Sequence, residues 1–372
     1  LGNHRLHGGP FERSLNERHH MTLKVLEDAL EHSSQFTQVG ADFVILGDLY
    51  DDVRPLPQSI AAVVDLFEKY RGTGTILKGN HDNVSETVGD HALGPLKHTC
   101  NVEDVPRCVF GFSVLPIYLP FIAEPAEDWV PETVATLLAE TVDPHQERVL
   151  MLHCGIHDAA MRKASSWDMA AARDAISVET LVEVCRKHRI SKVFAGNWHT
   201  YRSWHFDDSR IQIYQVGALV PTGWDNPGLF GYGGLLFLDG DGVVTRHEIA
   251  GPRFLNVTEA GELFDAIRTV RAYPAQAGTY SLFVRWRCGR SDRAAALAKL
   301  AELKELGQIH AFEVPPNTEA AGELVVQVAK TLRHDVTLAT AVDTAVGAVS
   351  LPEGVQRHRV AELTRRFLRV GA

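Results

Sequence analysis

The feature that most constrains this chain occurs four times: an apolar, strand-like run is followed at once by Asp, Asn or His. The four places are Phe43–Leu46 before Gly47-Asp48, Ile76-Leu77 before Gly79-Asn80-His81-Asp82, Val149–Leu152 before His153, and Lys192–Ala195 before Gly196-Asn197-Trp198-His199. Continuous apolar runs are typical of parallel strands buried on both faces. Because open α/β sheets build ligand sites at the carboxyl ends of their strands, the pattern predicts an α/β fold with one polar site there.

The residue types in these motifs indicate a metal centre. Asp, Asn and His offer oxygen and nitrogen ligands that suit Mn, Fe, Zn or Mg. A carboxylate such as Asp48 can bridge two ions, and two neighbouring ions can clamp a phosphate oxygen. In three of the four motifs a glycine before the ligand lets the backbone turn sharply. Each motif taken alone is also explained by a turn with a solvated polar residue, but four motifs in this order favour the metal centre.

The motifs resemble those of the calcineurin-like metallophosphoesterases in order and spacing. The matching residues are Gly47-Asp48, Gly79 to Asp82, His153 and Gly196-x-x-His199. Within that superfamily the chain looks most like the nuclease subunit of the SbcCD double-strand-break complex, particularly its phage relatives. The stretches that support this narrower resemblance are Gly47–Asp51, Tyr214–Ala218 and Pro252–Phe254.

The resemblance implies a fold and a division of the chain. Residues 1–252 would form a four-layer α/β/β/α sandwich, and residues 253–372 a small α+β domain that caps the active site. The pattern changes at about residue 253, and Ser281–Cys288 alternates, with Leu282, Val284 and Trp286 on one face. On or just beyond the other face, Arg285, Arg287, Arg290 and Arg293 are candidates for contacts with DNA phosphates. A solvated charged face explains each of these arginines equally well.

The resemblance also implies the chemistry. Two divalent ions, Mn²⁺ or Mg²⁺, would support hydrolysis of DNA phosphodiester bonds. Asp48 would bridge the ions, Asn80, His153 and Asn197 would bind the second ion, and His199 would bind the first. His81, positioned by Asp82, would assist the leaving oxygen. The family implies an SbcC-like ATPase as partner and a homodimeric assembly.

Two departures from the family pattern leave alternatives open. The usual motif Gly-His-x-His is here Gly196-Asn197-Trp198-His199, and the neutral oxygen of asparagine favours harder ions. The family's first motif, Asp-x-His followed by Leu-Gly, is expected just before Leu1-Gly2. His4 or His7 could replace it, although neither follows a strand. His157 could also face the site, but a loop or helix-start histidine explains it as well.

Two other functions fit the sequence. A phosphatase or nucleotide phosphodiesterase acting on small molecules would need the same metal centre. Alternatively, Asn197 and the absent first motif would suit a degenerate phosphoesterase that serves as a scaffold for an ATPase.

The composition is compatible with each of these functions and does not distinguish between them. The 372 residues carry a net charge of −10, but residues 253–372 hold 16 basic against 13 acidic side chains, a net of +3. The five cysteines have no paired spacing, which favours a reducing cytoplasm. No apolar run is long enough for a transmembrane helix.

Periodicity and turn signals predict the remaining elements. Helices are expected at 13–35, 57–70, 131–141, 178–188, 291–306, 339–348 and 355–369. Further strands are expected at 109–117, 211–218, 233–249 and 308–314, with a hairpin turn at Asp239–Gly242 in the third of these.

Overall fold

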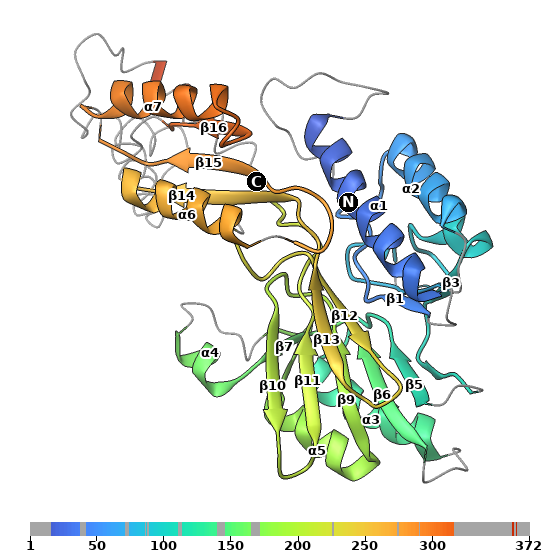
Figure 1. The fold of residues 1–372 in the computed structure, drawn as a ribbon. Helices are drawn as coiled ribbons and strands as arrows, with labels where there is room; N and C mark the ends of the chain where they lie inside the picture. The colour runs from blue at the N-terminus through green and yellow to red at the C-terminus, as the bar shows by residue number, and fades with distance from the viewer. Residues whose placement is uncertain are drawn as a thin grey trace.

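The computed structural model describes residues 16–37, 42–70, 74–85, 87, 89–110, 114–139, 146–164, 172–224, 227–273, 275–289, 291–315, 359, 360 and 362. The chain folds as a mixed α/β structure with several parallel sheets (Figure 1). This arrangement is compatible with the phosphoesterase-like α/β fold expected from the sequence. The four-layer sandwich and the capping role of the C-terminal part stay predictions.

The first sheet contains three parallel strands, β1 (Phe43–Ile45), β2 (Gly74–Leu77) and β3 (Asn101–Glu103). Helices α1 (Glu17–Thr37) and α2 (Pro57–Lys69) lie beside it (Figure 1), and a short 3₁₀ helix, η1 (Gly94–His98), precedes β3. Leu26, Val63 and Ile76 belong to one buried cluster that joins both helices to β2. Burial of this apolar surface holds β1 and β2 against the helices and so fixes where their carboxyl ends lie.

The larger sheet has six strands in the order β10 (Arg202–Phe206), β11 (Ile211–Gln215), β9 (Ile190–Ala195), β6 (Glu147–Leu152), β5 (Val114–Leu119) and β4 (Arg107–Cys108). The four central strands are parallel and both edge strands are antiparallel. Helices α3 (Ala126–Ala139) and α5 (Val178–His188) bury its largest apolar cluster. Ser177 caps the amino end of α5, where its side chain accepts a hydrogen bond from the Thr180 N–H.

Shorter elements complete this part of the molecule. The hairpin of β12 (Gly234–Leu238) and β13 (Val244–Glu248) packs against Val149, Phe194 and Tyr214 of the six-stranded sheet. Asp239 and Gly242 form its turn, so the predicted hairpin is confirmed. Strands β7 (Gly155–His157) and β8 (Ala175–Ser177) pair in parallel, and α4 (Ala159–Ala164) lies between them in sequence.

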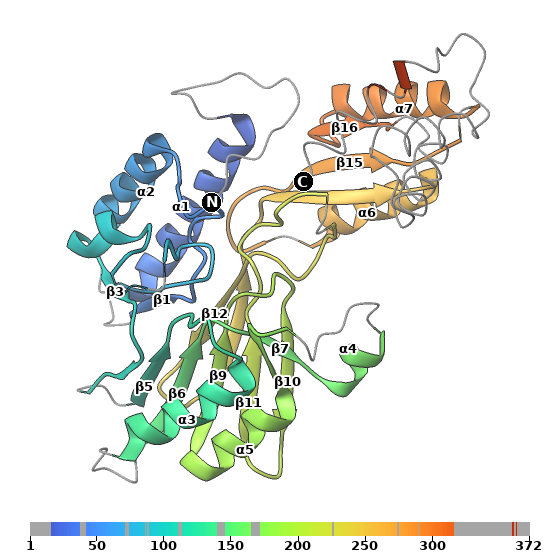
Figure 2. The ribbon, with the colours of Figure 1, turned by 180° about the vertical axis from the view of Figure 1, so that it is seen from behind.

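The last sheet is parallel and contains β14 (Pro252–Val257), β15 (Ser281–Trp286) and β16 (Ala311–Glu313). Helices α6 (Ala260–Ala272) and α7 (Arg293–Glu305) cover it, away from the six-stranded sheet in both views (Figures 1 and 2). Leu282, Val284 and Trp286 are buried together, which confirms the predicted alternation. Helices expected at 339–348 and 355–369 fall almost wholly outside the described residues, and the division at 252/253 stays a prediction.

Two expected elements differ most in their bounds. The helix expected at 131–141 begins five residues earlier, and Pro131 lies inside α3. The strand expected at 109–117 is β5, which begins at Val114 and continues to Leu119. No helix in the described part of the chain is long and apolar enough to cross a membrane.

Candidate functional site

The sheet of β1, β2 and β3 meets the six-stranded sheet at the carboxyl ends of their strands. The ring of His153, just after β6, contacts the carbonyl of Leu46 after β1, with Nδ1 and O 2.6 Å apart. The Gly196 N–H after β9 donates to the carbonyl of Leu152 at 2.9 Å. Gly47 has a φ of +92°, and a Cβ there would collide with the His153 ring. A Cβ on Gly79 would likewise collide with Asp48, so both glycines allow the ligand loops to approach closely.

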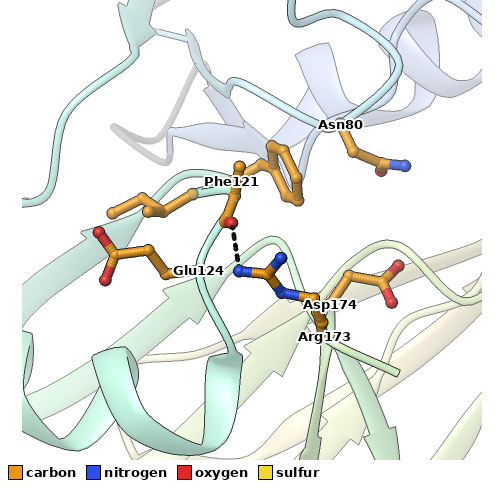
Figure 3. Close-up of a pocket in the computed structure, with 7 residues that line it drawn as sticks. Asn80, Phe121, Glu124, Arg173 and Asp174 are labelled. Carbon is orange, nitrogen blue, oxygen red and sulfur yellow. Dashed lines mark hydrogen bonds between the residues drawn. The ribbon is translucent and has the colours of Figure 1, made fainter. Parts of the chain in front are cut away.

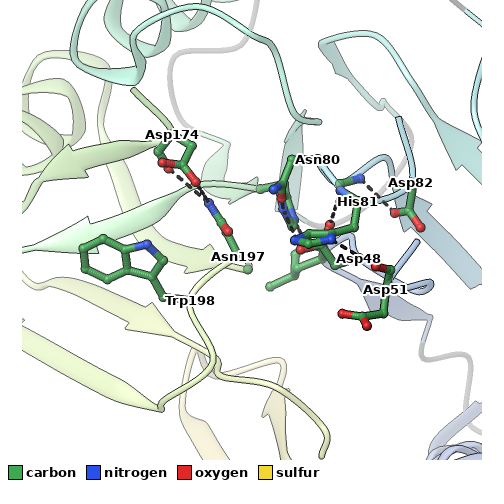
Figure 4. A network of polar contacts seen from close by, with 12 residues as sticks. Asp48, Asp51, Asn80, His81, Asp82, Asp174, Asn197 and Trp198 are labelled. Atoms are coloured by element: carbon green, nitrogen blue, oxygen red, sulfur yellow. Dashed lines mark hydrogen bonds and ion pairs between the residues drawn. The ribbon is translucent and has the colours of Figure 1, made fainter. Parts of the chain in front are cut away.

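Asp48 and Asn80, which Figure 4 labels, form the centre of this junction together with His153. The amide of Asn80 lies 2.9 Å from Nε2 of His153, and Nε2 lies 3.4 Å from the Asp48 carboxylate. Turned so that its NH₂ group faces them, the amide donates to Nε2 and to both oxygens of Asp48, at 3.3 and 3.2 Å. The Asp48 carboxylate and Nε2 of His153 are therefore two acceptor groups that lie close together beside the Asn80 amide.

The tautomer of His153 follows from its other contact. A backbone carbonyl only accepts hydrogen bonds, so Nδ1 carries the proton that it donates to Leu46. In the neutral ring Nε2 then has a lone pair directed at the Asn80 and Asp48 side chains. This is the arrangement in which metal-binding histidines are held by a second hydrogen bond.

These side chains fit a divalent cation. They offer a carboxylate, an imidazole nitrogen and an amide that can turn its oxygen inward. Oxygen ligands suit Mn²⁺ and Mg²⁺, and Mn²⁺ also accepts the imidazole nitrogen. Among the residues that the structure describes, no group of three or more His, Cys, Asp and Glu side chains is arranged to hold a metal ion. The third donor here is the Asn80 amide, which lies outside those four residue types.

The pKa values of Asp48 and His153 depend on each other. Burial opposes ionisation of Asp48, but the hydrogen bond and charge of His153, with the N–H of His81 at 3.0 Å, hold its pKa below the usual value. Burial also lowers the pKa of His153, whereas the carboxylate of Asp48 raises it, and the net shift is upward. A proton and a cation therefore compete for Nε2, since a metal-binding imidazole must be neutral.

Asp82 anchors the loops around this centre. Its side chain is fully buried, and it accepts hydrogen bonds from the main-chain N–H groups of Tyr50 at 3.1 Å and Gly79 at 3.0 Å. Burial, followed by repulsion from Asp48, raises its pKa. The prediction that Asp82 positions the ring of His81 needs correction: Asp82 holds the backbone on both sides of the centre.

His81 has a different partner for its ring. The side chain is exposed, and Nδ1 lies 3.2 Å from the main-chain carbonyl of Asp51. With Nδ1–H donating to that carbonyl, Nε2 is the nitrogen left to meet a substrate. The residue that holds the His81 ring is therefore Asp51, through its backbone.

The structure places Asn197 and His199 in the loop after β9. The amide of Asn197 donates to the carboxylate of Asp174 at 2.9 Å and to its carbonyl at 3.2 Å. Asn197 has a positive φ of 78°, as Asp48 does at 52°. His199 is half-buried, and its carbonyl accepts from the Ala218 N–H at 2.8 Å. The contacts of Asn197 lead to Asp174, and metal binding by Asn197 and His199 stays a prediction.

Gln215 at the end of β11 holds the loop after β9 through hydrogen bonds to its backbone. Its side chain is fully buried and donates to the carbonyls of Gly196 at 2.6 Å and Trp198 at 3.3 Å. It also accepts from the Ile156 N–H at 2.9 Å. A buried amide with these partners fixes the position of the loop that carries Asn197.

A pocket of about 310 Å³ opens beside Asn80 (Figure 3). Phe121, Ile122, Ala123 and Glu124 from the segment after β5 form one side, and Arg173 and Asp174 form the other. Arg173 spans the two sides by donating to the carbonyl of Ala123 at 3.3 Å. Asn80 thus lines the pocket and also contacts His153.

The other candidate residues lie elsewhere. His157 in β7 is buried between Arg162, 3.1 Å from Nδ1, and Glu127, 3.9 Å from Nε2. Arg285 pairs with Glu313 and lies over the Trp224 ring, 4.6 Å from its centre, so its charge is largely neutralised. These contacts weaken the case for Arg285 as a DNA ligand, and its contact with DNA stays a prediction.

Of the remaining predicted positions, only some lie within the described residues. Arg287 is exposed, and its contact with DNA stays a prediction. Arg290, His4, His7 and Leu1-Gly2 lie outside the described residues.

Comparisons with known proteins give a distant likeness. No family model matches the chain, and no curated protein does. Among solved structures the chain is similar to the crystal structure of TT1561 of Thermus thermophilus, at 15% sequence identity and a TM-score of 0.39. The match covers 61% of this chain and 94% of that one. At this level of similarity the likeness carries no conclusion about family or function.

Sequence reasoning missed Asp174, Arg173 and the anchoring role of Gln215. Arg173 and Asp174 precede β8 and follow no long apolar run, so no strand-end signal marked them. Gln215 stands within the stretch Tyr214–Ala218, where a polar residue in an apolar strand was the available signal.

Proposed function

We propose that this protein is a metal-dependent phosphoester hydrolase. The observation that supports the proposal most is the convergence of the Asp48 carboxylate, the Asn80 amide and Nε2 of His153. Asn197 and His199 are proposed as further ligands. A divalent cation bound there would neutralise phosphate charge and activate water.

The chain's own residues have separate tasks in this proposal. The Leu46 carbonyl accepts from Nδ1–H of His153, so in the neutral ring the lone pair is on Nε2, and Asp82 fixes the backbone of the ligand loops. His81 lies next to Asn80 in sequence, and its ring is held through Nδ1 by Asp51. As an imidazolium it would donate the Nε2 proton to the leaving oxygen, a role that typically contributes about 10²–10⁴ in rate.

The proposed substrate is DNA, and the proposed role is that of an SbcD-like nuclease subunit with an ATPase partner, in a homodimer in the cytoplasm. The order of the sequence motifs and the exposed Arg287 support this narrower proposal. All five cysteines lie in described segments and are unpaired, which suits a reducing compartment.

Hydrolysis of methyl p-nitrophenyl phosphate and of linear duplex DNA, each with Mn²⁺ or EDTA, tests the proposal. We expect Mn²⁺-dependent cleavage of both, and loss of cleavage in Asp48→Asn. Cleavage of methyl p-nitrophenyl phosphate alone would instead indicate a phosphodiesterase that acts on small molecules, and binding of an ATPase without any hydrolysis would indicate a scaffold.

The His81 role has its own test. His81→Ala should lose most DNA cleavage, by about 10²–10⁴, but much less cleavage of the nitrophenyl ester, whose leaving group needs no proton. An equal loss on both substrates would assign His81 to metal binding or structure.

A further inference from the structure

We propose that the pocket beside Asn80 binds the nucleobase next to the phosphate that is cleaved. This inference rests on the proposed hydrolase function and adds the substrate class: an ester with an unpaired nucleoside on one side of the phosphate. The pocket volume of about 310 Å³ is at the lower end of the range for small-molecule sites, about 300–1,000 Å³.

The position of the pocket supports this assignment. Asn80 is shared: its side chain contacts Nε2 of His153 on one side and lines the pocket on the other. A phosphate placed at the Asp48–Asn80–His153 centre would therefore have one substituent directed at the pocket. On the far wall, Asp174 is held by the Asn197 amide at 2.9 Å, so that wall is fixed to the loop of a second candidate ligand.

The charges in the pocket select an uncharged group. Glu124 and Asp174 outnumber Arg173, so a second phosphate in the pocket would meet net negative charge. A nucleobase instead offers a neutral edge with both donors and acceptors. The guanidinium of Arg173 can donate to that edge and the two carboxylates can accept from it.

The apolar surface selects a flat group. Phe121, which Figure 3 shows on the pocket wall, is half-buried, and its ring forms a T-shaped pair with that of His153, with centres 6.4 Å apart and planes at 88°. This contact occupies at most one face of the Phe121 ring, so a face is left for stacking, and Ile122 continues the apolar wall. Base stacking on aromatic side chains is typical of proteins that bind single-stranded nucleic acid.

The proposal has a consequence for DNA. A base inside a duplex is stacked and paired, so it enters such a pocket only after it is unpaired. The site should therefore prefer frayed or single-stranded nucleotides to the interior of a duplex.

Two esters with the same leaving group test the proposal: thymidine 5′-(p-nitrophenyl phosphate) and methyl p-nitrophenyl phosphate, each with Mn²⁺. Wild-type kcat/KM should be at least about tenfold higher for the thymidine ester. Phe121→Ala should reduce this preference by about 5- to 150-fold, the range expected for the loss of one stacked base. Phe121→Tyr should retain it, because the ring remains.

Phe110→Ala provides the matched control, since Phe110 is exposed and lies before β5, at the opposite end of that strand from Phe121. Phe121→Leu keeps apolar volume without a flat face and guards against misfolding of the alanine variant. Equal kcat/KM for the two esters in the wild type, or equal losses on both esters in Phe121→Ala and Phe121→Leu, would overturn the proposal. Failure of Mn²⁺ to support hydrolysis of either ester would instead refute the hydrolase function.

Discussion

Replacing Asp82 with alanine should destabilise the protein by about 2–4 kcal/mol. The carboxylate accepts hydrogen bonds from the N–H groups of Tyr50 and Gly79, and its side chain is fully buried. Each buried N–H left without a partner costs about 1–3 kcal/mol, which gives about 2–6 kcal/mol for two. Removing the buried carboxylate also relieves its desolvation and its repulsion from Asp48, so we expect the lower part of that range.

Urea denaturation followed by circular dichroism measures this loss. Asp82→Asn keeps one acceptor oxygen and should lose about half as much free energy of unfolding. Asp65→Ala is the control, because Asp65 is an exposed residue in α2 and should change stability by at most about 0.5 kcal/mol. A loss below about 1 kcal/mol in Asp82→Ala would refute the reasoning that Asp82 satisfies two buried donors.

Two further predictions concern other parts of the molecule. Burial, followed by the charge of His247, 2.8 Å away, lowers the pKa of His32. The unfolded chain therefore takes up this proton at a higher pH than the folded protein, and the folded protein should lose stability as pH falls below about 6.5. In urea titrations at pH 8 and pH 5, His32→Leu should reduce this loss of stability, and an unchanged loss would contradict the assignment. Arg287→Gln should weaken DNA binding and reduce the number of ions released on binding, read from the salt dependence of the affinity, by about one. Arg285→Gln should do neither, because Glu313 already neutralises Arg285. Fluorescence anisotropy at several salt concentrations measures both variants, and equal effects would show that Arg285 also contacts DNA.

The sequence predicted local structure well where one signal dominated. Helix α5 has the predicted bounds, 178–188, because its apolar stripe and the cap at Ser177 agree. The strand ends before Asp48, Asn80 and His153 were also found, since short apolar runs ending in polar residues are visible without tertiary information. Their meeting point followed from the general geometry of parallel sheets.

Long-range contacts account for what the sequence did not predict. Arg285 was considered for DNA because it lies on the charged face of its strand; the sequence did not reveal its partner Glu313, which lies on β16, 28 residues away. Asp82 was assigned to the adjacent His81, but one of its carboxylate oxygens accepts from the N–H of Tyr50, 32 residues away, and the other from the N–H of Gly79. Arg173 joins the candidate site only because β7 and β8 pair and bring residue 173 to the segment after β5. Such pairings depend on the whole fold and leave no local signal.

Titration of the protein with Mn²⁺ tests the central proposal most directly. By isothermal calorimetry at pH 8, Mn²⁺ should bind the wild type, and Asp48→Asn and His153→Gln should each weaken binding by about 10-fold or more, while Asp65→Ala should not. Because Nε2 of His153 must lose its proton, the wild-type affinity should fall as pH is lowered toward 6. Mn²⁺ binding that is the same in Asp48→Asn, His153→Gln and the wild type would contradict the proposed metal centre.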